Sequence, residues 1–264
     1  MTDWPYLSLE HPIRFAHRGS RILWPENTMH AFARAVEDYG YRYLELDVRV
    51  TRDRRVMVFH DATLERVTNG AGKITDWDYA ELAALDAAYW FGEDEGYPLR
   101  GGDITVPTLE EVYRTWPDVH VNIDLKASDI EWAVAEVVRA CGRENSTLIG
   151  SFRDRRIARF RRITKGAVAT SAGPRLVAAM IAAARAGRTL RSKVQAYQLP
   201  YNYRGMKITP RLVDAIHRAD AQIHLWTVDE PEDMHRFLDM GVDGIVTDRP
   251  DLLNDAIEER AGDV

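Results

Sequence analysis

Short runs of aliphatic and β-branched residues recur along the chain, and segments with apolar residues at helical spacing stand between most of them. Such runs are typical of buried parallel strands. Eight runs are candidate strands: Ile13–Ala16, the run at Leu44, Val119–Leu125, Thr147–Ser151, Val168–Ser171, Ala196–Leu199, Ile223–Val228 and Gly244–Thr247. Eight parallel strands joined by helices close a barrel, and 264 residues is a usual length for one. We therefore predict an α/β fold, a (β/α)8 TIM barrel formed as a single domain by residues 1–264.

Helix start and stop signals lie between the predicted strands. After the first strand, Asn27 or Thr28 is expected to cap a helix that Gly40 ends. Ser128 with Glu131 has the spacing of a capping box, for a helix ending at Gly142. Three more helix starts are predicted at Thr108 with Glu111, at Thr209 with Pro210 and at Pro231.

Two acidic residues share one face of the predicted second strand. Successive side chains of a strand point to opposite faces, so Glu45 and Asp47 project together. The polar segment that follows predicts a tight turn centred near Asp53 and Arg54, with Val56–His60 returning as a hairpin arm. That centre pairs Asp47 with His60. Taken alone, two acids in a strand are more often the solvent face of an edge strand.

Residues 62–102 break the alternation of strand and helix. They are rich in Gly, Asp and aromatic residues, and they separate the hairpin arm from the next helix. We expect them to form an insertion at the barrel mouth.

Charge and cysteine content exclude several classes of protein. A net charge of −6 argues against general attraction to nucleic acid or anionic lipid, so the Arg-rich segment Arg153–Arg162 is interpreted as a solvated helix face. The single cysteine, Cys141, precludes an intrachain disulfide. The first residues lack the features of a signal peptide, and no stretch approaches the roughly 18 apolar residues of a membrane span. We expect a cytoplasmic protein without stable membrane insertion.

Reactive side chains stand at the ends of the predicted strands. In a (β/α)8 barrel the functional groups lie at the carboxyl ends of the strands. Here these positions hold His17, Arg18, Glu45, Asp47, Asp124, Lys126, Ser151, Trp226 and Asp248. We therefore expect acids and bases to gather at one rim of the barrel.

Three carboxylates at this rim predict a cation site. Glu45, Asp47 and Asp124 would repel one another unless a cation neutralised them. Oxygen donors suit one hard divalent ion, Mg²⁺ or Ca²⁺. His17 and His60 are the groups able to exchange a proton near neutral pH.

Two basic residues extend this chemistry to phosphate. Arg18 and Lys126 are suited to hold phosphate oxygens, so the set predicts metal-assisted attack on a phosphodiester. A Schiff-base lyase that uses Lys126 and a non-catalytic binding barrel remain alternatives. Each residue alone has a structural explanation, but their joint occurrence favours the phosphodiesterase.

Ordered motifs over most of the chain resemble the glycerophosphodiester phosphodiesterase family. They are AHRG at 16–19, PENT at 25–28, LELDV at 44–48, VFHD at 58–61, VPTLEEV after the predicted insertion, LWTVD at 225–229 and GVDGIVTDRP at 241–250. The resemblance runs from about Ile13 to Leu252. HRG alone is a weak signal, whereas this many motifs in order form a strong one.

The resemblance implies hydrolysis of glycerophosphodiesters, which are small molecules, to sn-glycerol 3-phosphate and an alcohol. It implies a divalent ion on the acids matching Glu45, Asp47 and Asp124, with His17 and His60 as the acid/base pair. In the mechanism proposed for the family, a glycerol hydroxyl attacks phosphorus and water opens the resulting cyclic phosphate. An alternative is cleavage of lysophospholipids in the manner of a phospholipase D, with aromatic residues 89–91 admitting an acyl chain.

One position departs from the family pattern. Many members have glutamate where this chain has Asp124, and the shorter side chain could bind metal directly or through water. Glu26 is expected to touch the metal or Arg18. Trp226 is expected to pack against the glycerol carbons.

Overall fold

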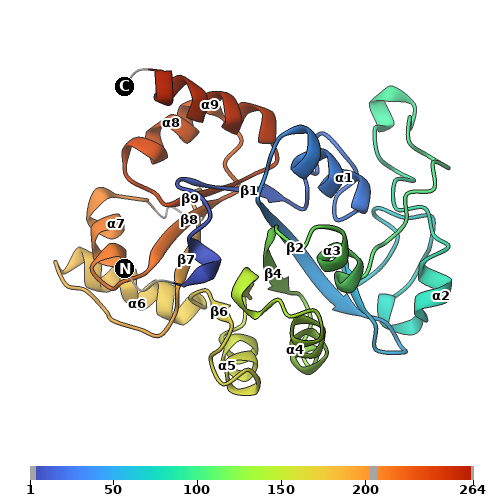
Figure 1. Ribbon diagram of the computed structural model, residues 1–264, viewed down its shortest axis with the longest axis horizontal. Coiled ribbons are helices and arrows are strands. Elements are labelled where there is room, and N and C mark those ends of the chain that lie inside the picture. Colours follow the sequence, from blue (N-terminus) through green and yellow to red (C-terminus); the bar gives the residue numbers. More distant parts are fainter. Residues whose placement is uncertain (1–3, 203–206, 263–264) are drawn as a thin grey trace.

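A nearly closed barrel of eight parallel strands forms the centre of the computed structural model, which describes residues 4–202 and 207–262 (Figure 1). The hydrogen-bonded order is β6-β5-β4-β2-β1-β9-β8-β7, and β3 pairs with β2 alone. The strands are β1 (Ile13–His17), β2 (Tyr43–Val50), β3 (Val56–Val58), β4 (His120–Leu125), β5 (Thr147–Gly150), β6 (Ala169–Thr170), β7 (Ala196–Pro200), β8 (Gln222–Trp226) and β9 (Gly244–Thr247). The predicted fold class is confirmed.

The barrel closes between β6 and β7 through a short seam. Ser171 and Ala196 form an isolated parallel bridge. The amide of Ala172 donates to the carbonyl of Ala196 at 2.8 Å, and the amide of Gln195 donates to the carbonyl of Thr170 at 3.0 Å. The amide of Thr170 also donates to Gln195 Oε1 at 2.8 Å, and the seam is short because β6 is two residues long.

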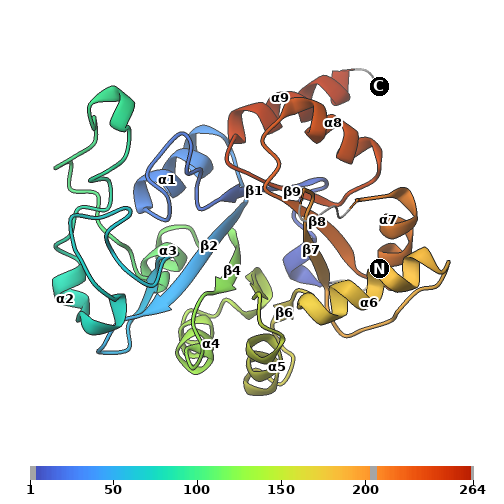
Figure 2. The ribbon, with the colours of Figure 1, turned by 180° about the vertical axis from the view of Figure 1, so that it is seen from behind.

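Helices surround the barrel on its outside (Figure 2). The α-helices are α1 (Met29–Ala33), α2 (Tyr79–Leu82), α3 (Leu109–Thr115), α4 (Glu131–Ala140), α5 (Asp154–Ile163), α6 (Pro174–Arg185), α7 (Pro210–His217), α8 (Pro231–Asp239) and α9 (Pro250–Gly262). Short helical turns are η1 (Pro5–Leu7), η2 (Arg34–Asp38), η3 (Ile74–Asp76), η4 (Glu93–Glu95) and η5 (Glu144–Ser146). Within the described ranges, no helix is both long and apolar enough to cross a bilayer.

Three of the predicted helix caps are confirmed, and one is wrong. The hydroxyls of Thr28 and Thr209 accept hydrogen bonds from the amides of Ala31 and Leu212, and Thr108 forms the predicted capping box with Glu111. The predicted box at Ser128 does not form, because α4 begins only at Glu131, after a residue that makes no side-chain cap. Asp129, with a φ of 66°, turns the chain between Ser128 and the helix.

The hairpin of β2 and β3 has a register one residue away from the prediction. Val48 pairs with Val58, and the amide of Phe59 donates to the carbonyl of Asp47 at 2.8 Å. Phe59, and not His60, therefore lies opposite Asp47. The register differs because the loop between the paired Val50 and Val56 has five residues and is centred on Asp53 alone. Arg54 in this loop has a left-handed conformation with a φ of 65°.

An apolar layer fills the barrel beneath its carboxyl-terminal rim. Phe15 and Tyr43 are completely buried and pack edge to face, with ring centroids 5.2 Å apart. Two residues further along the same strands stand His17 and Glu45. The alternation of a strand therefore lifts these polar side chains directly above the core.

Residues 62–102 contain η3, α2 and η4 and lie beyond α1 and α3 at the outer edge of the molecule (Figure 1). They bury Leu64, Ile74 and Leu82 against Met57 of β3. This apolar cluster attaches the segment to the hairpin that carries His60.

Candidate active site

A cavity of about 610 Å³ lies at the carboxyl ends of the barrel strands. Every predicted strand-end residue except Asp248 lines it: His17, Arg18, Glu45, Asp47, Asp124, Lys126, Ser151 and Trp226, together with His60. Side chains that are far apart in the sequence are thus gathered at one site.

The pairing register of the strands places the acidic residues beside polar residues of the adjacent strands. His17 lies beside Glu45, and Asp47 of β2 lies directly beside Asp124 of β4. Asn122 is the neighbour of Glu45 in β4 and also lines the cavity. Parallel pairing therefore sets the spacing of these groups without help from the loops.

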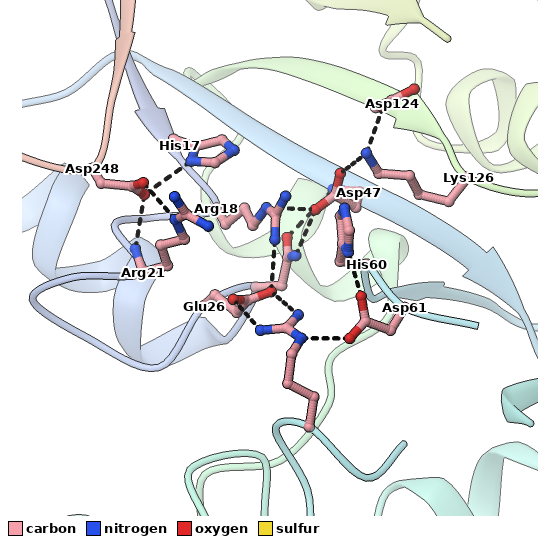
Figure 3. Close-up of polar contacts among 12 residues, drawn as sticks. His17, Arg18, Arg21, Glu26, Asp47, His60, Asp61, Asp124, Lys126 and Asp248 are labelled. Carbon is pink, nitrogen blue, oxygen red and sulfur yellow. Dashed lines mark hydrogen bonds and ion pairs between the residues drawn. The ribbon is translucent and has the colours of Figure 1, made fainter. Parts of the chain in front are cut away.

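Asp47 is the centre of the polar network (Figure 3). Its side chain is 1% exposed, and its Oδ2 lies 2.9 Å from Arg18 Nε while its Oδ1 lies 2.9 Å from Lys126 Nζ. Burial alone would raise the pKa of Asp47, but the charges of Arg18 and Lys126 outweigh burial and hold that pKa well below its usual range. Asp47 is therefore a permanent carboxylate.

Asn27 also belongs to the site, although its position before a helix predicted a helix cap. Its Nδ2 donates to Asp47 Oδ2 at 2.9 Å, and the amide of Asp47 donates to Asn27 Oδ1 at 3.3 Å. Thr28 provides the helix cap, which leaves Asn27 free to bind Asp47. The φ of 57° at Asn27 accompanies this orientation.

Lys126 lies between two carboxylates. Its Nζ is 2.6 Å from Asp124 Oδ2. Burial lowers the pKa of Lys126, but Asp47 and Asp124 more than offset this and raise it overall. Burial raises the pKa of Asp124, as does Asp47, against the opposing charge of Lys126. An ammonium held in its charged form is the opposite of what a Schiff-base nucleophile requires.

Glu45 is also buried, but its ion-pair contact is longer than those of Asp47. Its Oε2 accepts from the amide of Arg18 at 3.3 Å and lies 3.9 Å from His17 Nε2. Burial and the neighbouring charge of Asp47 raise the pKa of Glu45 to about 7. The ionised form of Glu45 is therefore less favoured than that of Asp47.

His17 is oriented by Asp248, a residue of the strand-end set to which the sequence assigned no role. His17 Nδ1 lies 2.9 Å from Asp248 Oδ1, and the Asp248 carboxylate also accepts from Arg21 Nε at 2.7 Å. Burial lowers the pKa of His17, but the hydrogen bond to Asp248 and the charge of Glu45 outweigh burial and raise it overall. The protonated imidazole is favoured.

His60 is oriented by a different carboxylate. Its Nδ1 hydrogen-bonds Asp61, whose other oxygen accepts from Arg66 Nε. Burial lowers the pKa of His60, and the charges of Arg18 and Lys126 add to that effect against the opposing charge of Asp47. The neutral imidazole is favoured, so the two histidines are shifted in opposite directions.

Glu26 ties the first loop to the segment 62–102. It accepts from Arg18 at 2.9 Å and from two Arg66 nitrogens at 2.8 and 2.7 Å (Figure 3). The expected contact of Glu26 with Arg18 is confirmed. Arg66 itself was not predicted, because nothing in the sequence of the loop distinguishes it from a surface arginine.

The donor set has the chemistry of a site for a hard divalent cation. Asp124 Oδ1 and Asn122 Oδ1 are buried oxygens that accept no hydrogen bond within the described residues, and Asp47 Oδ1 is buried against Lys126 Nζ. Lys126 lies against both aspartates. As the side chains stand, no three His, Cys, Asp or Glu residues in the described ranges are grouped to hold a metal ion. These oxygens and the clustered carboxylates fit such an ion once Lys126 releases one carboxylate.

One side of the cavity is apolar. Trp226 and Phe152 pack edge to face with ring centroids 5.6 Å apart, and both line the cavity with Val177, Ala178 and Ile181 of α6. Arg18 and Lys126 therefore share the cavity with an apolar wall.

Comparison with known proteins identifies the family to which this chain is similar. Residues 17–252 match the Glycerophosphoryl diester phosphodiesterase family. "Probable glycerophosphodiester phosphodiesterase 2" of Mycobacterium tuberculosis is 40% identical over 256 residues, 94% of this chain and 91% of that protein. The solved structure of a glycerophosphodiester phosphodiesterase from Agrobacterium tumefaciens has a TM-score of 0.77 and 26% identity, over 93% of this chain and 99% of that chain.

A human relative carries a different name. Lysophospholipase D GDPD1 of Homo sapiens is 26% identical over 275 residues, which are 91% of this chain and 84% of that protein. The family match covers most of the barrel and includes both histidines. The chain therefore belongs to the glycerophosphoryl diester phosphodiesterase family and is a phosphoric diester hydrolase.

Proposed function

We propose that this enzyme hydrolyses glycerophosphodiesters to sn-glycerol 3-phosphate and an alcohol, with one divalent cation, Mg²⁺ or Ca²⁺, and with His17 and His60 as the acid/base pair. The observation that carries the proposal is that these two imidazoles, each oriented by its own carboxylate, line one cavity with Glu45, Asp47 and Asp124. Two titratable groups whose pKa values are shifted in opposite directions suit opposite roles, one as the acid and the other as the base.

The opposite directions of the two pKa shifts support one direction of proton transfer. His60, neutral, takes the proton of the glycerol 2-hydroxyl as its oxygen attacks phosphorus. His17, protonated, gives its proton to the oxygen of the leaving alcohol as that P–O bond breaks. The product of this step is a five-membered cyclic phosphate.

The second step runs with the roles reversed. His17, now neutral, takes a proton from water as the water oxygen attacks phosphorus. His60 returns its proton to the glycerol 2-oxygen as the ring opens. Both histidines recover their starting state, and the phosphate stays on the glycerol 3-oxygen.

Charge on the transferred phosphate is balanced by the surrounding cations. Lys126 and Arg18 bind the phosphate oxygens after loosening their contacts with Asp47. Glu45, Asp47 and Asp124 would hold the divalent ion, which supplies Lewis-acid stabilisation of the negative charge at phosphorus. Trp226 packs against the glycerol carbons.

The deciding assay measures glycerol 3-phosphate release from glycerophosphocholine. Wild-type activity should disappear with EDTA and return with Mg²⁺, Mn²⁺ or Ca²⁺. His17→Ala and His60→Ala should each lower kcat by roughly two to four orders of magnitude while the thermal midpoint stays the same. His235→Ala, at a partly exposed histidine outside the cavity, is the control. Near-normal turnover in His17→Ala would refute the assignment.

Lysophospholipids are a second candidate substrate class. The apolar wall formed by Val177, Ala178 and Ile181 suits an acyl chain, and the human relative is named a lysophospholipase D. Rates on lysophosphatidylcholine and on glycerophosphocholine separate the two. A higher kcat/KM for the lysophospholipid would favour this second substrate class.

The boundaries of the unit form part of the proposal. We propose that residues 1–264 act as one domain and that residues 62–102 are an insertion at the barrel mouth. The contact of Arg66 with Asp61 and Glu26 supports a role of this insertion in shaping the site.

A further inference from the structure

The chain distributes its charge very unevenly. Residues 153–218 hold 16 Lys and Arg against 2 Asp and Glu, whereas the rest of the chain holds 19 Lys and Arg against 39 Asp and Glu. A protein of net charge −6 therefore concentrates a charge of +14 in one quarter of its sequence. Such a field attracts polyanions even when the whole molecule is acidic.

These basic residues form one surface. Residues 153–218 contain α5, α6 and α7, which lie next to one another along one side of the barrel (Figures 1 and 2). Of the 15 Lys and Arg described in this segment, 13 are exposed. We call this surface the basic flank.

A cavity of about 350 Å³ indents the basic flank between α6 and α7. Three exposed cations, Arg185, Lys207 and Arg211, line it over an apolar base. In the part of the chain that the structure describes, none of the three has an ion-pair partner. Unpaired cations around a hollow suit a phosphate group.

α6 connects this cleft with the active-site cavity. Ile181 lines both, while Val177 and Ala178 line the active-site cavity one turn earlier. At about 1.5 Å of rise per residue, Ile181 and Arg185 are roughly 6 Å apart along the helix. An apolar strip therefore leads from the basic cleft into the catalytic cavity.

The rim of the active site joins the same surface. Phe152 lines the active-site cavity and is 58% exposed, and it is followed directly by the exposed Arg153. An aromatic side chain beside a cation suits the interfacial layer of a bilayer.

We infer that the basic flank docks on the surface of an anionic phospholipid bilayer, with the cleft between α6 and α7 binding a lipid phosphate headgroup. The cations meet the anionic headgroups, and the apolar strip of α6 meets hydrocarbon. A nucleic acid would match the charge but would leave that strip against a polar backbone. Docking brings the active-site cavity next to the lipids from which glycerophosphodiesters and lysophospholipids derive.

Vesicle sedimentation tests the inference without any assay of catalysis. The wild-type protein should bind vesicles of phosphatidylcholine with added phosphatidylglycerol, should bind phosphatidylcholine alone much more weakly, and should dissociate as salt rises. Neutralising the cleft in R185Q/K207Q/R211Q should weaken binding by about 100-fold, since each cation near an anionic surface contributes about fivefold. The matched control R34Q/R42Q/R114Q removes the same charge from the opposite side and should bind like wild type.

Several results would overturn the inference. They are absence of binding to the anionic vesicles, equal losses in both triple variants, tighter binding to duplex DNA than to vesicles, or full displacement by millimolar inorganic phosphate, which would indicate a site for free phosphate. All three proteins should release glycerol 3-phosphate from soluble glycerophosphocholine at the same rate. A failure to dock is therefore distinct from a failure of the proposed activity.

Discussion

Asp248 Oδ1 lies 2.9 Å from His17 Nδ1, although the two residues are 231 positions apart in the chain. They meet because β1 and β9 are neighbours in the barrel and both end at the same rim. The ring nitrogen that faces Glu45 is thereby fixed as Nε2. Asp248 is a positioning residue, since it is fully buried and does not line the cavity.

Asp248→Asn should lower kcat by about 100-fold, because the imidazole loses both its orientation and its charge partner. Loss of the hydrogen bond that raises the pKa of His17 also lowers that pKa. In the proposed mechanism His17 acts in its protonated form, so the alkaline limb of the kcat/KM profile should move to lower pH. Asp251→Asn, which affects an ion pair with Arg249, is the control. An unmoved alkaline limb would contradict the assignment.

Lys126→Met should lower kcat/KM by roughly 100- to 1,000-fold, because the variant loses one charged donor to the phosphate. Divalent-cation binding, measured by calorimetry, should be retained or tightened, since Asp47 and Asp124 lose their competing ammonium. The exposed Lys165→Met should change neither quantity. Loss of cation binding together with activity would instead make Lys126 a support of the cation site.

Arg66→Met should lower kcat/KM by about tenfold, because Asp61 loses the guanidinium that orients it toward His60. The free energy of unfolding should change by less than about 1 kcal/mol, since half-exposed ion pairs contribute little. Arg52→Met is a matched control, because Arg52 also pairs with two acids, Asp78 and Glu81, at similar exposure. Equal activity in both variants would argue against a role for Arg66.

His224 should make the fold sensitive to acid. It is completely buried, and burial lowers its pKa to about 4. Between about pH 6.5 and pH 4 the unfolded chain binds this proton and the folded chain does not, so stability falls as pH falls through that window. The contribution is about 3 kcal/mol.

Urea unfolding measured across that window checks the prediction. His224→Asn should lose part of the steep acid slope of the wild type, whereas the surface variant His235→Asn should keep it. Identical slopes in wild type and His224→Asn would show that His224 is not the source.

Hydrophobic runs were sufficient to predict the barrel and the gathering of its strand ends. The alternation of side chains also placed Glu45 and Asp47 on one shared face of their strand. The hairpin register was wrong by one residue, because Arg54 adopts a left-handed conformation that propensity does not reveal. Asn27 was interpreted as a cap for the same reason, since its orientation toward Asp47 depends on its own positive φ.

The net charge of the whole chain was the least informative quantity for predicting its charged surfaces. A total of −6 suggested a solvated face for Arg153–Arg162, although residues 153–218 carry opposite charge to the remainder of the chain. The sum over the chain hides this separation, because the acidic residues lie elsewhere. Charge is therefore better read segment by segment once the topology is known.

The bridge from Glu26 through Arg66 to Asp61 limits how the enzyme can be recombined with its relatives. Residues 62–102 cannot be grafted from another family member as an independent module, because the graft would have to bring an arginine in register with both acids. Directed evolution of specificity in that segment is consequently tied to the orientation of His60, which hydrogen-bonds Asp61. Libraries that keep Arg66 fixed should yield a much larger share of active clones than libraries that randomise it.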